Sequence, residues 1–197
     1  MPTLPLNIDM QGKTALVVGG GKVALRKVRA LLASGASLLV VAPEICRELA
    51  ELAASGAVSV RRGCYTSADL DAAFLAVAAT DAAAVNRAVA TDASERGILV
   101  MVADNPLAGN CTFPAVLRRG DLEITVSTGG RCPALAAEIR DMIAGVIGDE
   151  YGAVLEQLAV EREKLLTDGS ASTYNTQVLR SLAGRLIAEI AERKDTA

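Results

Sequence analysis

Three consecutive glycines, Gly19-Gly20-Gly21, directly follow the apolar run Thr14–Val18. A short apolar run that ends in glycine is typical of a buried strand followed by a tight turn. Between residues 22 and 34, four apolar side chains recur at helical spacing: Ala24, Val28, Leu31 and Leu32. Gly35 ends this pattern. The sequence therefore predicts a strand, a glycine turn and a helix in this order.

The same alternation continues to about residue 110. We expect further strands at Leu38–Ala42, Ala57–Arg61, Phe74–Ala78 and Ile98–Val102. We expect helices from Pro43 to about Ser55 and from Asp81 to Arg96, the second capped by Thr80 or Asp81. Short apolar strands that alternate with helices indicate a parallel, doubly wound α/β sheet, and we assign it residues 1–110.

The pattern changes after Asp104. Cys111–Leu117 and Leu122–Ser127 predict an antiparallel hairpin. A helix is expected to begin near Pro133, because proline is favoured at the first helical position. The remainder, to about Arg193, is predicted to be helical apart from a polar break at residues 167–172.

Composition excludes several classes of protein. Hydrophobic residues make up 51% and charged residues 22% of the 197, which is typical of a globular chain. A net charge of −3, with five Phe plus Tyr and no Trp, argues against nucleic-acid binding. The chain has no apolar run of membrane-spanning length and its N-terminus does not resemble a secretory signal, so we expect a cytoplasmic protein without a membrane partner.

Cysteine and histidine usage restricts the chemistry. The four cysteines, Cys46, Cys64, Cys111 and Cys132, are scattered along the chain. This spacing favours reduced thiols over a disulfide framework or a structural zinc site. There is no histidine. Any general acid or base must therefore be Asp, Glu, Lys, Tyr or Cys, and histidine metal sites are excluded.

The glycine turn fits a dinucleotide-binding fingerprint, Gly19-x-Gly21-x-x-Ala24. The alternative is a glycine turn in an α/β domain that binds no dinucleotide. An acidic residue is expected about 20 residues further on, at the ribose, but the chain reads Ala42-Pro43 there, followed by Glu44. We interpret Glu44 as complementing the start of its own helix. Because no arginine directly follows this strand, NAD is favoured over NADP.

Other polar stretches allow two readings each. Asp104 and Asn105 follow the fifth strand, where open α/β sheets bind ligands, but Asp-Asn-Pro can also be a simple turn. Residues 127–133 form a hydroxyl- and glycine-rich turn that could bind an anion or merely cap a helix. Asn86 can be no more than a polar residue on a helix.

Four ordered segments together resemble one family: VVGGGKVALRK, AATDAAAVN, VADNP and FPAVLRRGDLEITVSTGGRCPALA. They are similar to the motifs of the precorrin-2 dehydrogenase/sirohydrochlorin ferrochelatase family, the dehydrogenase-chelatase part of siroheme synthase. The resemblance covers roughly residues 6–140. It implies a Rossmann domain at 1–110, a dimerisation region at 111–147 and a helical C-terminal domain at 148–197, with an intertwined homodimer.

The family resemblance also implies an activity. Its members oxidise precorrin-2 to sirohydrochlorin with NAD, and many also insert ferrous iron to give siroheme. Some stand-alone members do not insert iron, and both possibilities stay open here. Two other classes compete with the enzyme: an NAD(H)-sensing regulatory or interaction module without tetrapyrrole chemistry, and a structural dimerisation module.

Site residues can be carried over from the family motifs. Asp104 matches the aspartate proposed as general base. The cofactor positions are Gly19, Gly21, Lys22, Val23, Ala42, Pro43, Thr80 and Asp81. The substrate carries eight carboxylates and needs a basic rim, and the substrate-binding candidates are Asn105, Arg118, Arg119, Thr128, Gly129 and Arg131.

Four residues temper this carry-over. Arg118-Arg119 can also be a solvated hairpin turn. Thr128 and Cys132 both depart from serines that are found at these positions in relatives. We expect Cys111 and Cys132 to be small buried residues, and we assign no metal site.

Overall fold

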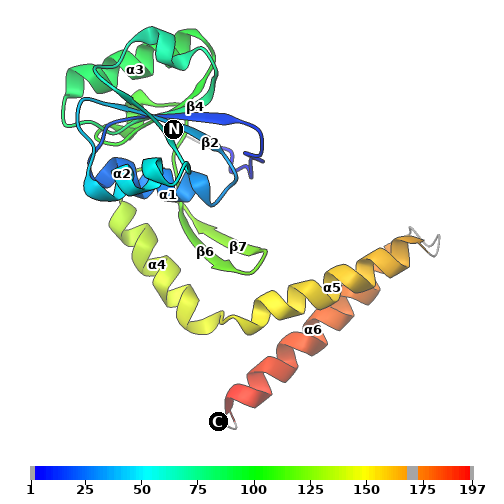
Figure 1. The fold of residues 1–197 in the computed structure, drawn as a ribbon. Helices are drawn as coiled ribbons and strands as arrows, with labels where there is room; N and C mark the ends of the chain where they lie inside the picture. Colours follow the sequence, from blue (N-terminus) through cyan, green and yellow to red (C-terminus); the bar gives the residue numbers. More distant parts are fainter. Residues whose placement is uncertain (1–2, 168–172, 196–197) are drawn as a thin grey trace. The chain divides into compact units, whose positions relative to one another are not determined.

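A parallel sheet of five strands forms the centre of the first of two units in the computed structural model, which describes residues 3–167 and 173–195 (Figure 1). Unit 1 is Met1–Phe113 and unit 2 is Pro114–Ala197. In sheet order the strands are β3 (Ser59–Arg62), β2 (Ser37–Ala42), β1 (Thr14–Val18), β4 (Ala73–Ala78) and β5 (Leu99–Val102). The predicted doubly wound sheet is confirmed, because the strand order reverses between β1 and β4.

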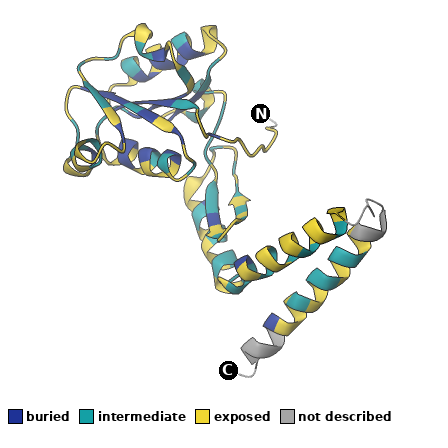
Figure 2. Cartoon of the chain, turned by 45° about the vertical axis from the view of Figure 1, so that its right-hand side comes forward, coloured by how far each residue is buried: buried dark blue, intermediate teal, exposed yellow. Residues whose placement is uncertain are grey.

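Helices cover both faces of this sheet. Helices α1 (Lys22–Leu32) and α2 (Arg47–Ala54) lie on one face, and α3 (Ala83–Glu95) lies on the other (Figure 1). Each face has its own apolar core, with Val17 and Val40 in one and Leu16 and Val41 in the other. The central strands are therefore the most buried part of the unit (Figure 2), which explains why they read as uninterrupted apolar runs.

Helix α2 begins later than predicted. The expected start at Pro43 is wrong, since the helix begins at Arg47 with Cys46 as its N-cap. The backbone of Glu44 and Ile45 instead lies against Gly20, and the amide of Cys46 donates a hydrogen bond of 2.8 Å to the Gly20 carbonyl. A tertiary contact holds these residues outside the helix, so Glu44 does not belong to the first turn of α2.

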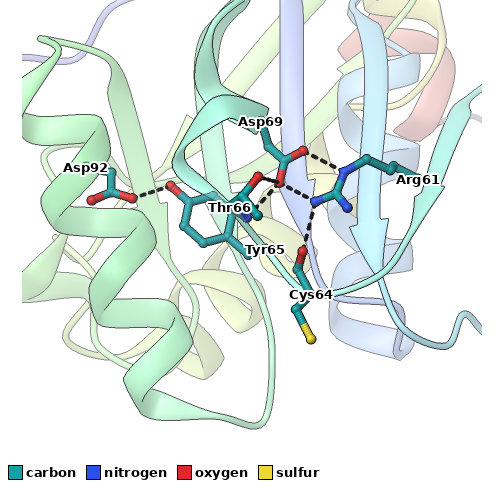
Figure 3. Close-up of polar contacts among 6 residues, drawn as sticks. All are labelled: Arg61, Cys64, Tyr65, Thr66, Asp69 and Asp92. Carbon is teal, nitrogen blue, oxygen red and sulfur yellow. Dashed lines mark hydrogen bonds and ion pairs between the residues drawn. The ribbon is translucent and has the colours of Figure 1, made fainter.

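The connection from β3 to β4 is held by a polar cluster of six residues: Arg61, Cys64, Tyr65, Thr66, Asp69 and Asp92 (Figure 3). Arg61 donates two hydrogen bonds to Asp69 and one of 2.9 Å to the Cys64 carbonyl. Burial opposes the ionisation of Asp69, but hydrogen bonds from Arg61 and the Thr66 amide outweigh it and lower the pKa of this carboxyl. Within this cluster, the Tyr65 hydroxyl donates to Asp92 on α3 at 2.8 Å.

Unit 2 contains a hairpin and three helices. Strands β6 (Ala115–Arg119) and β7 (Leu122–Val126) pair antiparallel, as predicted, although β6 begins later than the expected Cys111. The helices are α4 (Pro133–Val146), α5 (Glu150–Thr167) and α6 (Thr173–Asp195). Helix α4 begins at Pro133 as expected, but the single helical stretch predicted up to residue 167 is interrupted by residues 147–149. Most of the predicted polar break, residues 168–172, lies outside the described residues.

The interruption after α4 has a visible cause. The Arg119 guanidinium donates to the carbonyls of Ile147 at 2.9 Å and Ala144 at 3.3 Å, which satisfies acceptors at the end of the helix. Gly152 packs directly against the backbone of Arg119, where a side chain would not fit. None of the described helices is long and apolar enough to cross a membrane.

Candidate functional site

The loops that follow four neighbouring strands leave from one edge of the sheet. Val18 lies opposite Val41 on β2 and Ala78 on β4, and Ala78 lies opposite Val102 on β5. The residues that come next are the glycine turn after β1, Pro43 after β2, Thr80 after β4 and Asp104 after β5. Parallel pairing thus brings the unit 1 candidates to the carboxyl edge, where such sheets bind ligands.

The glycine turn is packed on two sides and open on the third. Gly19 has φ +129°, and a Cβ atom there would overlap the Ala79 carbonyl oxygen. A Cβ atom at Gly20 would overlap the Glu44 carbonyl oxygen. At Gly21, in contrast, a Cβ atom would meet no atom within 4 Å. The first two glycines are therefore needed for packing, and the third leaves free space in front of the turn.

This free space lies at the N-terminus of α1. The first helical hydrogen bond runs from the Leu25 amide to the Gly21 carbonyl at 3.0 Å, so the amides of residues 22–24 precede the helical ladder. The first turn contains no acidic residue. An open glycine position beside free amide groups fits the pyrophosphate of a dinucleotide, because the amides and the helix dipole both favour an anion. Lys22 and Val23 are exposed here.

Basic residues stand beside the position of the missing ribose acid. Strand pairing places Arg61 opposite Val41 and Arg62 opposite Ala42. Arg61 is engaged by Asp69, whereas Arg62 is exposed. The residues that directly follow β2 in the sequence include no arginine. A local sequence pattern does not predict this pair, because both arginines come from the neighbouring strand β3.

A buried amide links the loops after β4 and β5. Asn86 on α3 is 1% exposed. Its Nδ2 donates to the Thr80 carbonyl and to Asp104 Oδ1, both at 2.9 Å. Its Oδ1 accepts hydrogen bonds from the Thr80 amide at 3.1 Å and from the Thr80 hydroxyl at 2.7 Å. The sequence alone allowed Asn86 to be no more than a polar residue on a helix, because its contact with Asp104, 18 residues away, follows from the fold.

Asp104 is exposed at this edge and carries one polar contact from Asn86. Asn105 and Asp81 are exposed as well. The short helix η2 (Pro106–Ala108) follows, and its Leu107 side chain is 74% exposed. One oxygen of the exposed Asp104 carboxylate is thus held by Asn86, an arrangement suited to a general base.

The glycine-rich loop of unit 2 is folded by its own hydroxyl groups. Thr128 Oγ1 accepts a hydrogen bond of 3.1 Å from the Cys132 amide, and Ser127 Oγ accepts one of 3.2 Å from the Gly129 amide. Cys132, the N-cap residue of α4, makes no side-chain cap. Thr128 binds the amide of the N-cap residue itself, so it orders the loop before α4 but does not accept from the amides of the first helical turn.

The arginines of unit 2 differ in their engagement. Arg118 and Arg119 lie in β6 and not in the turn that follows it. Arg118 pairs with Glu123 on the opposite strand at 2.5 Å, and Arg119 is bound to the end of α4. Arg131 is exposed, and none of the ion pairs of the described residues involves it. Of the three candidates Arg118, Arg119 and Arg131, Arg131 is therefore the one most available to a ligand.

The cysteines are free thiols. Cys111 is half-buried against the core of unit 1, and burial raises its pKa to about 11. Cys132 is exposed, and the expectation that it is buried is wrong, because the loop before α4 carries it on the surface. Among the described residues no three Cys, Asp or Glu side chains are grouped so that they could hold a metal ion.

Comparisons with known proteins agree with the geometry of unit 1. The family model of NAD(P)-binding domains matches residues 6–115, and a model described as "Sirohaem biosynthesis protein central" matches residues 119–145. The solved structure of SirC, a precorrin-2 dehydrogenase, is similar over 93% of this chain and 100% of its own, with a TM-score of 0.72 and 27% identity.

Curated relatives are similar over most of the chain. A siroheme synthase of Chromobacterium violaceum is 49% identical over 152 residues, which is 77% of this chain and 32% of the relative. Siroheme synthase 2 of Aeromonas salmonicida is 36% identical over 196 residues, 99% of this chain and 40% of the relative. The chain thus matches between 32% and 40% of the length of these siroheme synthases.

Proposed function

Because the chain belongs to the precorrin-2 dehydrogenase/sirohydrochlorin ferrochelatase family, we propose that it oxidises precorrin-2 to sirohydrochlorin with NAD. The observation that carries this proposal is the position of Asp104. A carboxylate held by a buried amide shares one sheet edge with a glycine turn that has room for a dinucleotide. This edge supplies both parts that a dehydrogenation needs, a site for the hydride acceptor and a base.

The cofactor site is assigned to unit 1. Gly19, Gly21, Lys22 and Val23 would receive the pyrophosphate at the N-terminus of α1. Bound NAD would supply the nicotinamide ring that accepts a hydride. We assign the two ends of the cofactor to the loops on either side of the turn, which contain Ala42, Pro43, Thr80 and Asp81. Backbone groups of the β2–α2 loop then replace the usual ribose acid.

Asp104 is assigned the proton transfer. Loss of a hydride from the tetrapyrrole leaves a cation, and removal of a ring proton by a carboxylate gives the neutral, more conjugated product. Asn86 contacts Oδ1 of Asp104, so we assign Oδ2 to the substrate. The chain has no histidine, and a carboxylate is a base that is available in its place.

The substrate rim is assigned by charge. Precorrin-2 carries eight carboxylates, and arginine binds carboxylates through paired N–H donors. Of the candidates Asn105, Arg118, Arg119, Thr128, Gly129 and Arg131, we rank Arg131 first, because Arg118 and Arg119 already have partners in the fold. Ferrous-iron insertion is proposed as a second activity, with Asp104 accepting a pyrrole proton and iron as a substrate.

We further propose that the chain forms a homodimer through residues 111–147 and the helical domain 148–197. Unit 2 exposes large apolar side chains on all three of its helices, among them Leu135, Met142, Val160 and Ile187. Apolar side chains left exposed in this way are typical of protein interfaces. The four free thiols suit a cytoplasmic location, where thiols stay reduced.

The deciding experiment is an anaerobic assay of precorrin-2 with NAD that follows sirohydrochlorin by absorbance. We expect NAD-dependent conversion by the wild type, and a loss of kcat of about 10²-fold or more in Asp104→Ala, the usual contribution of a general base. Binding of NADH, measured by fluorescence, should persist in this variant. NADH binding without conversion by the wild type would instead support a sensing module.

Ferrous iron added after the oxidation tests the second activity. Siroheme should then form faster than in a protein-free control. A rate equal to that control would remove the chelatase from the proposal and leave the dehydrogenase intact.

A further inference from the structure

Asn86 is the one polar residue that is buried among the residues the structure describes. It lies on α3, on the face that packs against the sheet, and its neighbours Val89, Ala90 and Ala93 on this face are apolar. An apolar side chain would fill such a position without the cost of burying an amide. The presence of an amide therefore calls for an explanation in terms of its partners.

All four hydrogen-bonding positions of this amide are used. Two acceptor sites face the Thr80 amide and hydroxyl, and two N–H groups face the Thr80 carbonyl and Asp104 Oδ1. This pattern fixes the orientation of the amide. A flipped amide would direct its oxygen at a carbonyl and a carboxylate, and its N–H groups at the Thr80 N–H donor. An N–H group is thus permanently aimed at Asp104.

We propose that Asn86 is a positioning residue for the dehydrogenation, which fixes the Asp104 carboxylate relative to the Thr80–Asp81 loop. The inference rests on the proposed role of Asp104. Asn86 belongs to a rigid helix, whereas both of its partners lie in loops. One buried side chain therefore sets the position of the base relative to the neighbouring loop, and Oδ2 of Asp104 is the carboxylate oxygen without a contact to Asn86.

A double-mutant cycle on kcat tests whether Asn86 acts through Asp104. With NAD and precorrin-2 both saturating, we expect Asn86→Ala to lower kcat by about 10- to 100-fold, as for loss of a hydrogen bond to a charged group. In an Asp104→Ala background the same change should alter kcat by less than about twofold, because no carboxylate is left to position. Equal losses in both backgrounds would refute the proposal.

A matched control separates positioning from the stability of α3. Val89 is fully buried on the same helix and belongs to the apolar core of this face, so Val89→Ala removes core packing and none of the hydrogen bonds to the loops. We expect Val89→Ala to lower the melting temperature and to keep kcat within about twofold of the wild type. A kcat loss in Val89→Ala as large as that of Asn86→Ala would show a merely structural effect. If Asn86→Ala does not fold, Asn86→Ser enters the same cycle with the same criteria.

A measurement without turnover keeps this inference separate from the proposed function. The side-chain amide of Asn86 can be followed by ¹H–¹⁵N NMR in the wild type and in Asp104→Ala. We expect a clear shift of one of its two N–H resonances, and an unchanged spectrum would refute the contact. If the resonance shifts between the two proteins but the wild type does not convert precorrin-2, the proposed function is refuted and the contact between Asn86 and Asp104 still stands.

Discussion

The three glycines of the turn have three different tasks at the residue scale. Gly19 adopts a backbone conformation that L side chains rarely adopt, Gly20 allows the β2–α2 loop to cross the turn, and Gly21 keeps space open at the N-terminus of α1. A common fingerprint treats the middle position as arbitrary. In this chain the middle glycine has as strict a steric requirement as the first.

The two neighbouring glycines should therefore respond differently to the same substitution. In Gly20→Ala the new methyl group forces the glycine turn and the backbone of Glu44 apart. We expect the free energy of unfolding of this variant to be about 1–3 kcal/mol lower than that of the wild type. Gly21→Ala meets open space at an ordinary φ of −89°, so its stability should stay within about 0.5 kcal/mol of the wild type. Its affinity for NADH should fall about tenfold, because the methyl group occupies space that we assign to the pyrophosphate.

Urea unfolding and NADH fluorescence titration check this pair. The opposite pattern, a destabilised Gly21→Ala that still binds NADH as tightly as the wild type, would contradict the assignment of the open space to the cofactor.

Sequence patterns predict single residues only where a local rule applies. Gly19 and Gly21 follow from a motif with fixed spacing, and Asp104 follows from its place after a strand. Gly20, Arg62 and Asn86 depend on which strands are neighbours and in what register. Their partners Glu44, Ala42 and Asp104 lie 18 to 24 residues away in the chain, and no local pattern contains this information.

The link between β3 and β4 illustrates the scale of elements, because ion pairing replaces regular structure there. Asp69 is 6% exposed at its side chain and holds Arg61 and the start of the short helix η1 (Ser67–Leu70) together. The folded state thereby favours the ionised carboxyl, with a pKa below its ordinary value. A carboxyl of this kind stabilises the fold above its unfolded pKa, and the contribution is lost as the pH falls through the folded pKa.

We therefore expect a pH-dependent effect of Asp69→Asn. At pH 7 the variant should be less stable by about 1.5–3 kcal/mol, as for loss of hydrogen bonds to a charged group. The difference from the wild type should shrink below about pH 4, where the carboxyl of the unfolded chain begins to bind protons while that of the folded state stays ionised. Urea unfolding at a series of pH values measures the difference in free energy of unfolding between the wild type and Asp69→Asn. A difference that stays constant down to pH 3 would contradict this account. Asp71→Asn, at an exposed surface pair with Arg96, is the matched control and should change little.

Elements were predicted best where apolar periodicity alone defines them. Strand β1 agrees residue for residue, and the other strands of the sheet agree within two residues. The errors lie where a tertiary contact overrides propensity: Gly20 holds the loop before α2, and Arg119 binds the end of α4. Both contacts join segments that are distant in sequence, so the local signals for α2 and α4 contained no trace of them.

The two units differ in how they bury apolar surface at the scale of the whole molecule. Unit 1 encloses two apolar cores, whereas α5 and α6 of unit 2 carry few buried residues (Figure 2). On α4, the side chains of Leu135, Met142 and Val146 recur at a spacing of seven and four residues, which places them on one face, and each is at least 51% exposed. A substitution on this exposed face of α4 therefore tests the proposed dimer.

We expect Met142→Lys to weaken the dimer about tenfold or more, because a buried interface does not accommodate an unpaired ammonium group. Asp141→Lys on the same helix is the control for charge, since the Asp141 side chain is exposed and pairs with Arg140 of the same helix. Sedimentation velocity over a concentration series gives the dimer constant. NADH binding in unit 1 should be the same in both variants. A wild type that sediments as a monomer at all concentrations would contradict the dimer itself.

The contact of Gly20 with Glu44 also has a consequence for redesign. The nucleotide turn and the loop before α2 interlock through backbone atoms, so neither can change its course unless the other moves too. Residues 19–21 and 43–46 therefore form one exchangeable block. An attempt to alter the cofactor preference by grafting an acidic ribose-binding loop from another dehydrogenase should transplant the glycine turn of the donor together with it.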